Sequence, residues 1–194
     1  MDRALDVCFG LTAISWSVLG LVHDDDLPLG VRAVLSAVNV VVGVLFIART
    51  DAKDRAAAAD LARALPSVLA SGVAYRLALP VWPMALVIAH GLFGLVALGS
   101  LATLGRSFAI LPARREIVAR GPYRLVRHPI YLAELGMLVT ACASRGVLAA
   151  IGGAALVLAV LVPRILVEER MLGADAAYGA YREKVRFRLV PGVF

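Results

Sequence analysis

The sequence predicts an all-α integral membrane protein with about six transmembrane helices. Hydrophobic residues make up 61% of the 194 residues and charged residues 18%, whereas soluble domains have about 45–50% apolar and about 25% charged residues. The mean hydropathy is +0.85, and so short a chain cannot hide that much apolar surface from water. The second observation is a set of long apolar runs, near residues 7–22, 29–48, 81–104 and 147–167. A lipid bilayer is therefore the expected solvent for most of the chain.

Each long apolar run is an expected transmembrane helix, because a helix of roughly 20 residues crosses a bilayer. The first run, residues 7–22, is slightly short, and its polar interruptions are Thr12, Ser15 and Ser17. Their hydroxyls can bond to carbonyls of their own helix. No small-residue cleavage site is visible in this run, so we expect a retained helix rather than a signal peptide.

Two shorter apolar segments, residues 65–79 and 130–143, decide the number of crossings. The acidic connection at residues 23–28 suits the outside, whereas basic residues after the second and third long runs suit the cytoplasm. Each charged connection lies on its expected side of the membrane only if residues 65–79 also cross. Residues 130–167 then form a helical hairpin that returns the chain to the cytoplasm. The result is six crossings with both termini in the cytoplasm. If residues 65–79 lie flat instead, there are five crossings and the N-terminus faces outside.

Charged residues divide the chain into two regions. Residues 1–104 hold the N-terminal transmembrane helices, and the alanine-rich stretch near 51–64 predicts a short helix on the cytoplasmic surface. Residues 105–194 hold most of the polar chemistry. Between Gly105 and His128 there are six arginines and one acid, and because they flank apolar runs we expect lipid headgroups, not nucleic acid, as their partner. The two cysteines show no metal-binding spacing, so no metal site is expected.

One group of polar side chains gathers where a helix enters the membrane. His128 precedes Pro129, which pushes it out of the α region, and the proline suits the first turn of the next helix. Tyr131 and Glu134 are three residues apart on that helix and share one face. Headgroup anchoring explains arginine, tyrosine and histidine at such a boundary. Glu134 is different, because an ionisable group within an apolar segment is costly unless it faces a polar site.

A second polar group lies at the cytoplasmic end of the last apolar run. Arg164 and Glu168 are four residues apart and face the same way, and Glu169 follows directly. An ordinary surface ion pair would explain the first two and is worth only about 0.3–0.5 kcal/mol. Adjacent glutamates point in different directions, so one of them is a candidate partner for hydroxyl or amine groups of a ligand.

Together the two groups resemble a known family. The stretch Gly121-Pro-Tyr-Arg-Leu-Val-Arg-His-Pro-Ile-Tyr131 is similar to the signature of isoprenylcysteine carboxyl methyltransferases and phospholipid N-methyltransferases. The tail resembles the C-terminus of the same family in three features, which are Glu168-Glu169, Tyr178 with Tyr181, and Arg186-Phe-Arg-Leu-Val-Pro191. The likeness covers residues 104–194. One departure is Arg115, which stands where the family usually has a histidine.

The resemblance implies a methyltransferase that uses S-adenosylmethionine and releases S-adenosylhomocysteine, with a cytoplasmic cofactor pocket closed by the C-terminal segment. It implies that the following residues bind the cofactor: Gly121, Tyr123, Arg127, His128, Tyr131, Glu168 and Glu169. By the same resemblance Arg164 positions a substrate carboxylate, and Arg164 and Glu168 are the expected catalytic residues. Glu134 is a further candidate for binding the substrate. In a bacterium the membrane would be the inner one.

The expected reaction is methyl ester formation on a lipidic or prenylated acceptor of isoprenylcysteine type. A carboxylate is already ionised at neutral pH, and attack on a sulfonium neutralises both charges, so a site that excludes water favours it. Arg164 could grip both carboxylate oxygens, which a lysine cannot do. An amine or phospholipid acceptor is an alternative that needs a base, for which Glu134 is a candidate.

Two further alternatives belong to other classes. A sterol-reductase-like oxidoreductase resembles the same C-terminal region, but the nicotinamide fingerprint Gly-x-Gly-x-x-Gly is absent from the sequence. A non-enzymatic membrane scaffold would tolerate replacement of His128 and Glu168. The sequence leaves the acceptor's identity and the oligomeric state open.

Overall fold

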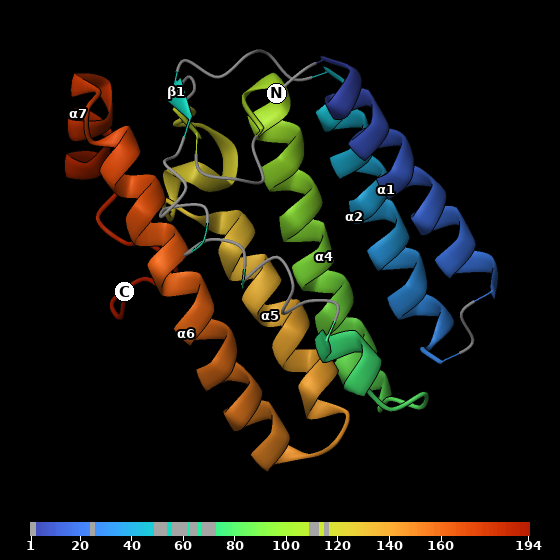
Figure 1. The fold of residues 1–194 in the computed structure, drawn as a ribbon. Coiled ribbons are helices and arrows are strands. Elements are labelled where there is room, and N and C mark those ends of the chain that lie inside the picture. Colours follow the sequence, from blue (N-terminus) through green and yellow to red (C-terminus); the bar gives the residue numbers. More distant parts are fainter. Residues whose placement is uncertain are drawn as a thin grey trace.

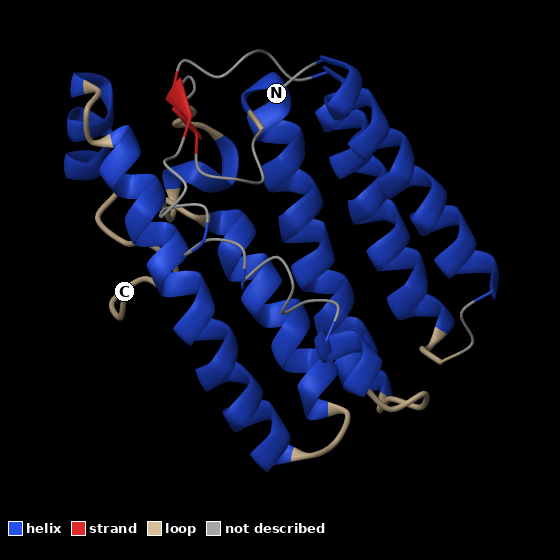
Figure 2. Cartoon of the chain, in the orientation of Figure 1, coloured by secondary structure: helices blue, strands red, loops and turns tan. Residues whose placement is uncertain are grey.

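The computed structural model of the protein is almost wholly helical (Figures 1 and 2). It describes residues 3–23, 26–48, 54–55, 62, 66, 73–108, 113–114 and 117–194. Within them the exceptions to helix are loops and one antiparallel pair of two-residue strands, β1 (Asp54–Arg55) and β2 (Ala113–Arg114). The predicted all-α class is confirmed for the described part of the chain.

The long helices are α1 (Arg3–His23), α2 (Leu29–Ala48), α4 (Met84–Leu104) and α6 (Val147–Leu172). Each contains a stretch long and apolar enough to cross a membrane, by length and composition. The four long apolar runs are thus confirmed as helices. A shorter apolar helix, α5 (Pro129–Ala143), precedes α6.

Two expectations fall largely outside the described residues. For the surface helix expected over 51–64, the structure describes a strand at Asp54–Arg55 and little else. For the segment 65–79, residues 73–77 form a helical turn, while residues 67–72 lie outside the described part.

Helices α1 and α2 touch backbone to backbone. A Cβ atom added to Gly10 would lie 2.6 Å from the carbonyl oxygen of Gly43, and one added to Gly43 would lie 2.6 Å from that of Gly10. The Ser36 hydroxyl donates a hydrogen bond of 2.9 Å to the carbonyl oxygen of Ser17. Small residues allow the two helix backbones to come this close. Close packing of this kind holds helices together in a bilayer, where the hydrophobic effect does not drive them to associate.

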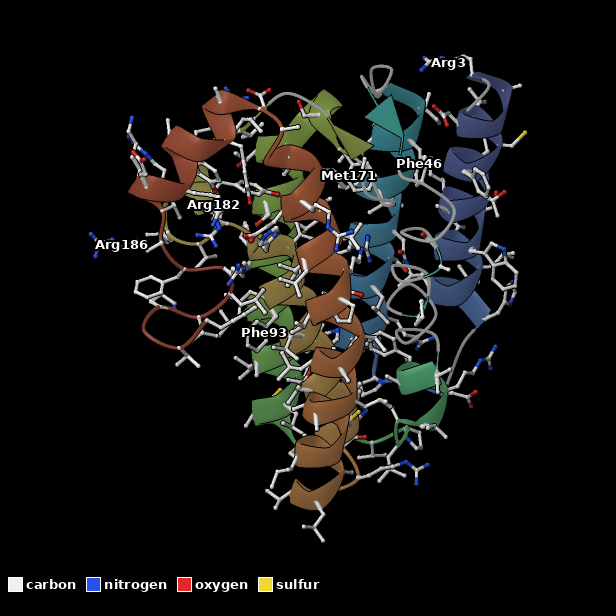
Figure 3. The ribbon with its side chains drawn as sticks, turned by 60° about the vertical axis from the view of Figure 1, so that its left-hand side comes forward. Arg3, Phe46, Phe93, Met171, Arg182 and Arg186 are labelled. Carbon is white, nitrogen blue, oxygen red and sulfur yellow. The ribbon has the colours of Figure 1, made fainter. Side chains whose placement is uncertain are left out.

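Glycines also bring α4, α5 and α6 together. A Cβ atom at Gly136 on α5 would collide with the ring of Phe93 on α4, which Figure 3 labels. A Cβ atom at Gly153 on α6 would lie 2.5 Å from Cys142 Sγ on α5. The turn between α5 and α6 uses Gly146, whose φ of 109° favours glycine.

The directions of the helices gather one set of ends in one place. Phe46 near the end of α2 packs with Leu101 near the end of α4, and Val31 near the start of α2 packs with Leu86 near the start of α4. These two helices therefore run parallel, and α5 runs against them. The C-terminal ends of α2, α4 and α6 lie near the start of α5, in the upper part of Figure 1. The short helices η2 (Gly121–Arg124) and α7 (Ala176–Lys184) lie at the same end.

Candidate active site

The loop before α5 has a backbone that requires glycine at its start. Gly121 has φ 55°, and a Cβ atom there would lie 2.8 Å from Thr103 Oγ1 on α4. Pro122 and the next two residues complete the short helix η2, and Pro129 occupies the first turn of α5. His128 caps α5 with φ −125° and ψ 61°, so the sequence-predicted boundary lies where the helix begins.

A buried carboxylate joins this loop to α6. The Glu169 side chain accepts hydrogen bonds from Arg127 Nε at 2.8 Å and Arg188 Nε at 2.9 Å, and lies 3.2 Å from His128 Nε2. Glu169 is 7% exposed, and Arg127 and His128 are also buried. A buried carboxylate is costly unless it is paired and hydrogen-bonded, and here three basic side chains meet that need. Glu169 therefore holds three chain segments together.

The C-terminal segment, residues 185–194, is fixed to the same loop by its backbone. The amides of Arg127 and His128 donate to the carbonyl oxygens of Phe187 and Arg188, each at 2.9 Å. Arg127 Nη1 also donates to the carbonyl oxygens of Val185 and Arg186 at 2.8 and 2.7 Å. These contacts make the segment a strap over the loop. The side chain of Arg186 points away from the helices (Figure 3).

Tyrosines add a second link between α7 and the loop. The Tyr181 hydroxyl donates a 2.7 Å hydrogen bond to the carbonyl oxygen of Tyr123. Burial raises the pKa of Tyr181 to about 12, so its phenol keeps its proton at neutral pH. Burial, helped by the negative charge of Glu168, likewise raises the pKa of Tyr123 above its usual range.

Tyr131 connects the two polar groups that the sequence singled out. Its hydroxyl donates a 2.6 Å hydrogen bond to Glu168 Oε2, and the Arg164 guanidinium carbon lies 4.9 Å from the centre of its ring. The His128 ring stacks on Tyr131 with centroids 5.5 Å apart. Arg164 follows Pro163 in α6 and is 5% exposed. Cation and carboxylate therefore flank one aromatic side chain, which suits a ligand that carries both charges.

A cavity of about 430 Å³ opens beside these side chains, within the range of about 300–1,000 Å³ that small-molecule sites occupy. Charged and polar residues occupy the end near the start of α5, and the walls toward α2 and α4 are apolar except for Asn39. Its apolar lining includes Val38, Val42, Ala97, Leu101 and Met137. The cavity can thus take a polar group and a hydrocarbon part together.

The cavity brings together most of the residues that the sequence suggested. Seven of them line it, namely Tyr123, Arg127, His128, Tyr131, Glu134, Arg164 and Glu168. Gly121 and Glu169 do not line it: Gly121 lies against Thr103, and Glu169 faces Arg127 and Arg188. Arg115, where the chain departs from the family pattern, lies outside the described residues.

Sequence reasoning missed the contribution of the N-terminal half. Leu35, Val38, Asn39 and Val42 on α2 line the cavity, as does Tyr75. Their spacing of one, three, four and seven residues along α2 marks one helix face. An asparagine in the middle of an apolar helix was the available signal, because a polar side chain there needs a polar neighbour.

Comparison with protein families gives this geometry a context. Residues 80–174 match the model of the isoprenylcysteine carboxyl methyltransferase (ICMT) family. The match covers just under half of the chain and supports the assignment of this region to the family. No curated protein matches the chain.

The match to the isoprenylcysteine carboxyl methyltransferase model supports a membrane methyltransferase of that general type. The matched residues include α4, α5 and α6, and with them the cavity residues from Ala97 to Glu168. Helices α1 and α2 lie before the match and α7 lies after it. The wall that α2 contributes to the cavity is therefore a feature of this chain outside the matched region.

Proposed function

We propose that the protein transfers a methyl group from S-adenosylmethionine to the carboxylate of a lipidic acceptor of isoprenylcysteine type. The observation that carries the proposal is the cavity itself, which has a charged end and an apolar wall within the region matched by the family. When bound, S-adenosylmethionine would supply a methyl group on a positively charged sulfur. The protein would mainly align the acceptor with that group, which lowers barriers by up to about 7–11 kcal/mol.

The residues present fit that cofactor. Its amino acid part carries an ammonium and a carboxylate, for which the Glu168 carboxylate and the basic Arg127 and His128 are suitable partners. Its adenine and ribose suit aromatic and hydroxyl side chains, which Tyr123 and Tyr131 offer. We assign cofactor binding to these five residues. Glu169 and Gly121 take a supporting role in this proposal, because neither lines the cavity.

Arg164 is the proposed partner of the acceptor carboxylate. It lies one helical turn before Glu168 and deeper in α6, so it separates the polar end of the cavity from the apolar wall. A planar guanidinium can hold both oxygens of a carboxylate at once. Its burial excludes water, which favours a reaction between opposite charges that yields neutral products.

An amine acceptor, as in phospholipid N-methylation, is the second candidate. The observation in its favour is Glu134, a half-buried carboxylate that lines the cavity one turn from Tyr131. An ammonium must lose a proton before it can attack, so that reaction needs a base. Replacing Glu134 by Gln should abolish N-methylation but leave O-methylation of a carboxylate largely intact.

We also propose six membrane crossings with both termini and the active site in the cytoplasm. The parallel course of α2 and α4 supports this arrangement, since the chain must return between them. Single cysteines at Arg3 and Glu183, labelled from each side of sealed vesicles, test it. Labelling of the two positions from opposite sides would contradict it.

The decisive experiment measures cofactor binding and methyl transfer on the purified protein in detergent. Calorimetry with S-adenosylhomocysteine should show binding, and NADPH should show none; the reverse result would favour an oxidoreductase. Transfer of labelled methyl to N-acetyl-S-farnesyl-cysteine should then fall about 10- to 100-fold in Arg164→Lys, since one charge-assisted hydrogen bond is lost. The control Arg186→Lys changes a side chain that points away from the helices. Equal transfer by Arg164→Lys would remove the proposed role of Arg164.

A further inference from the structure

A second cavity adjoins the first. It has a volume of about 830 Å³ and lies between the end of α1, the start of α2 and residues 75–80. Three residues line both cavities, Leu35, Asn39 and Tyr75. These three side chains are therefore the boundary at the deep end of the active-site cavity, and we call them the floor.

Asn39 makes the floor polar. It stands in the middle of α2, whose other cavity-lining residues are Leu35, Val38 and Val42. Asn39 is an exposed residue, and its side-chain amide carries two donors and an acceptor. A polar group at this depth is disfavoured in an apolar helix unless a polar partner meets it. Asn39 faces both cavities, so it can meet a polar group of a ligand that enters from the active site.

Tyr75 supplies a second polar residue at the same boundary. Its hydroxyl oxygen is buried, and in the described part of the chain it has no hydrogen-bond partner. The His90 ring meets the Tyr75 ring edge-on, with centroids 5.8 Å apart. A buried hydroxyl without a partner lacks a hydrogen bond that a ligand could supply.

The distance from the reacting end to the floor can be worked out along α5. The acceptor carboxylate would lie beside Arg164, at the level of Tyr131, and the cavity reaches down to Leu138. Seven residues of α-helix rise about 10 Å. A staggered chain of about eight atoms covers that distance.

We propose that Asn39 and Tyr75 form a specificity subsite that binds a hydroxyl or carbonyl group in the tail of the acceptor. The proposal rests on the proposed function for the position of the reacting end. It names the substrate class more closely: a carboxylate at one end, a short hydrocarbon, and a hydrogen-bonding group about eight atoms away. The two side chains come from segments before residue 80, outside the region matched by the family.

Two probes of equal length test the subsite, N-acetyl-S-pentyl-cysteine and N-acetyl-S-(4-hydroxybutyl)-cysteine, and in the second the hydroxyl oxygen is the eighth atom from the carboxyl carbon. Calorimetry on the full-length protein with S-adenosylhomocysteine present gives the dissociation constant of each probe without requiring methyl transfer. The wild type should bind the hydroxy probe about tenfold more tightly than the plain one, as expected for one or two neutral hydrogen bonds. Asn39→Leu and Tyr75→Phe should each reduce that ratio to about threefold or less.

Ser36→Ala is the matched control. Ser36 lies on α2 and lines the second cavity but not the first, so its loss should leave the ratio unchanged. Equal binding of the two probes by the wild type overturns the proposal, as does failure of the hydroxy probe to bind or a ratio that neither substitution alters. If the hydroxy probe binds preferentially but is not methylated when S-adenosylmethionine replaces the product, the subsite stands and the proposed reaction fails.

Discussion

Replacing Glu169 by Ala should release the C-terminal segment from the active site. The Glu169 carboxylate pairs with Arg127, His128 and Arg188 at 2.8, 3.2 and 2.9 Å, and it is 7% exposed. Its removal leaves buried positive charge on Arg127 without its counter-ion, and breaking a buried pair in this way costs about 3–5 kcal/mol. Since each 1.4 kcal/mol is a factor of ten, the fraction of molecules with an open strap should rise by a factor of about 100 to about 4,000.

Hydrogen exchange measures this opening directly. The amides of Arg127 and His128 donate to the carbonyl oxygens of Phe187 and Arg188, so their protection reports whether the segment is docked. In Glu169→Ala their exchange should accelerate by the factor given above. Glu169→Gln keeps one acceptor oxygen, so the two amides should exchange faster than in the wild type and more slowly than in Glu169→Ala. Binding of S-adenosylhomocysteine should weaken in parallel, because Arg127 and His128 lose the group that orients them.

Glu183→Gln supplies the control for charge alone. Glu183 is exposed on α7 and close to the same segment in sequence, so its neutralisation should leave the exchange of both amides unchanged. Unchanged protection in Glu169→Ala would refute the reasoning. So would a loss of cofactor affinity without faster exchange, because Glu169 would then contact the cofactor itself.

Three further predictions follow from single contacts. Tyr131→Phe keeps the ring beside Arg164 but removes the hydrogen bond to Glu168, so calorimetry should show S-adenosylhomocysteine binding weakened about tenfold or more. Gly121→Ala places a Cβ at positive φ against Thr103 and should lower thermal stability by about 1–3 kcal/mol, whereas Gly99→Ala, with open space around it in α4, should not. Stability should fall as pH rises from about 10 to about 12, because the unfolded chain releases the Tyr181 proton first while the folded pKa is about 12; Tyr181→Phe should flatten that decline in a pH series of thermal unfolding.

The local chemistry of the site could be read from short-range rules. His128 before Pro129 predicted a helix start, and α5 begins there. The spacing of Arg164 and Glu168 predicted a shared face, and both line the cavity. Such inferences work because a helix fixes the relative direction of residues three or four apart without help from the rest of the fold.

Short-range rules could not predict which of Glu168 and Glu169 faces the cavity and which pairs with basic side chains. Neighbours on a helix point about 100° apart, so only one of them can face the cavity. Arg188 decides which, since it pairs with Glu169 from a segment 19 residues away. Asn39 was missed for a related reason: its cavity role depends on how α2 packs against helices far along the chain, and no local pattern encodes that packing.

The length of α6 has a consequence for where the lipid meets the enzyme. The helix has 26 residues, which gives about 39 Å at 1.5 Å per residue, whereas the hydrocarbon core of a bilayer is about 30 Å thick. With Val147 at the far boundary, about six residues stand clear of the hydrocarbon, and they carry Glu168 and Glu169. Arg164 then lies at the level where lipid headgroups begin. The proposed acceptor could present its charged end at that depth while its tail lies in the cavity between the helices, within the hydrocarbon layer, so the proposed reaction requires no extraction of the lipid from the membrane.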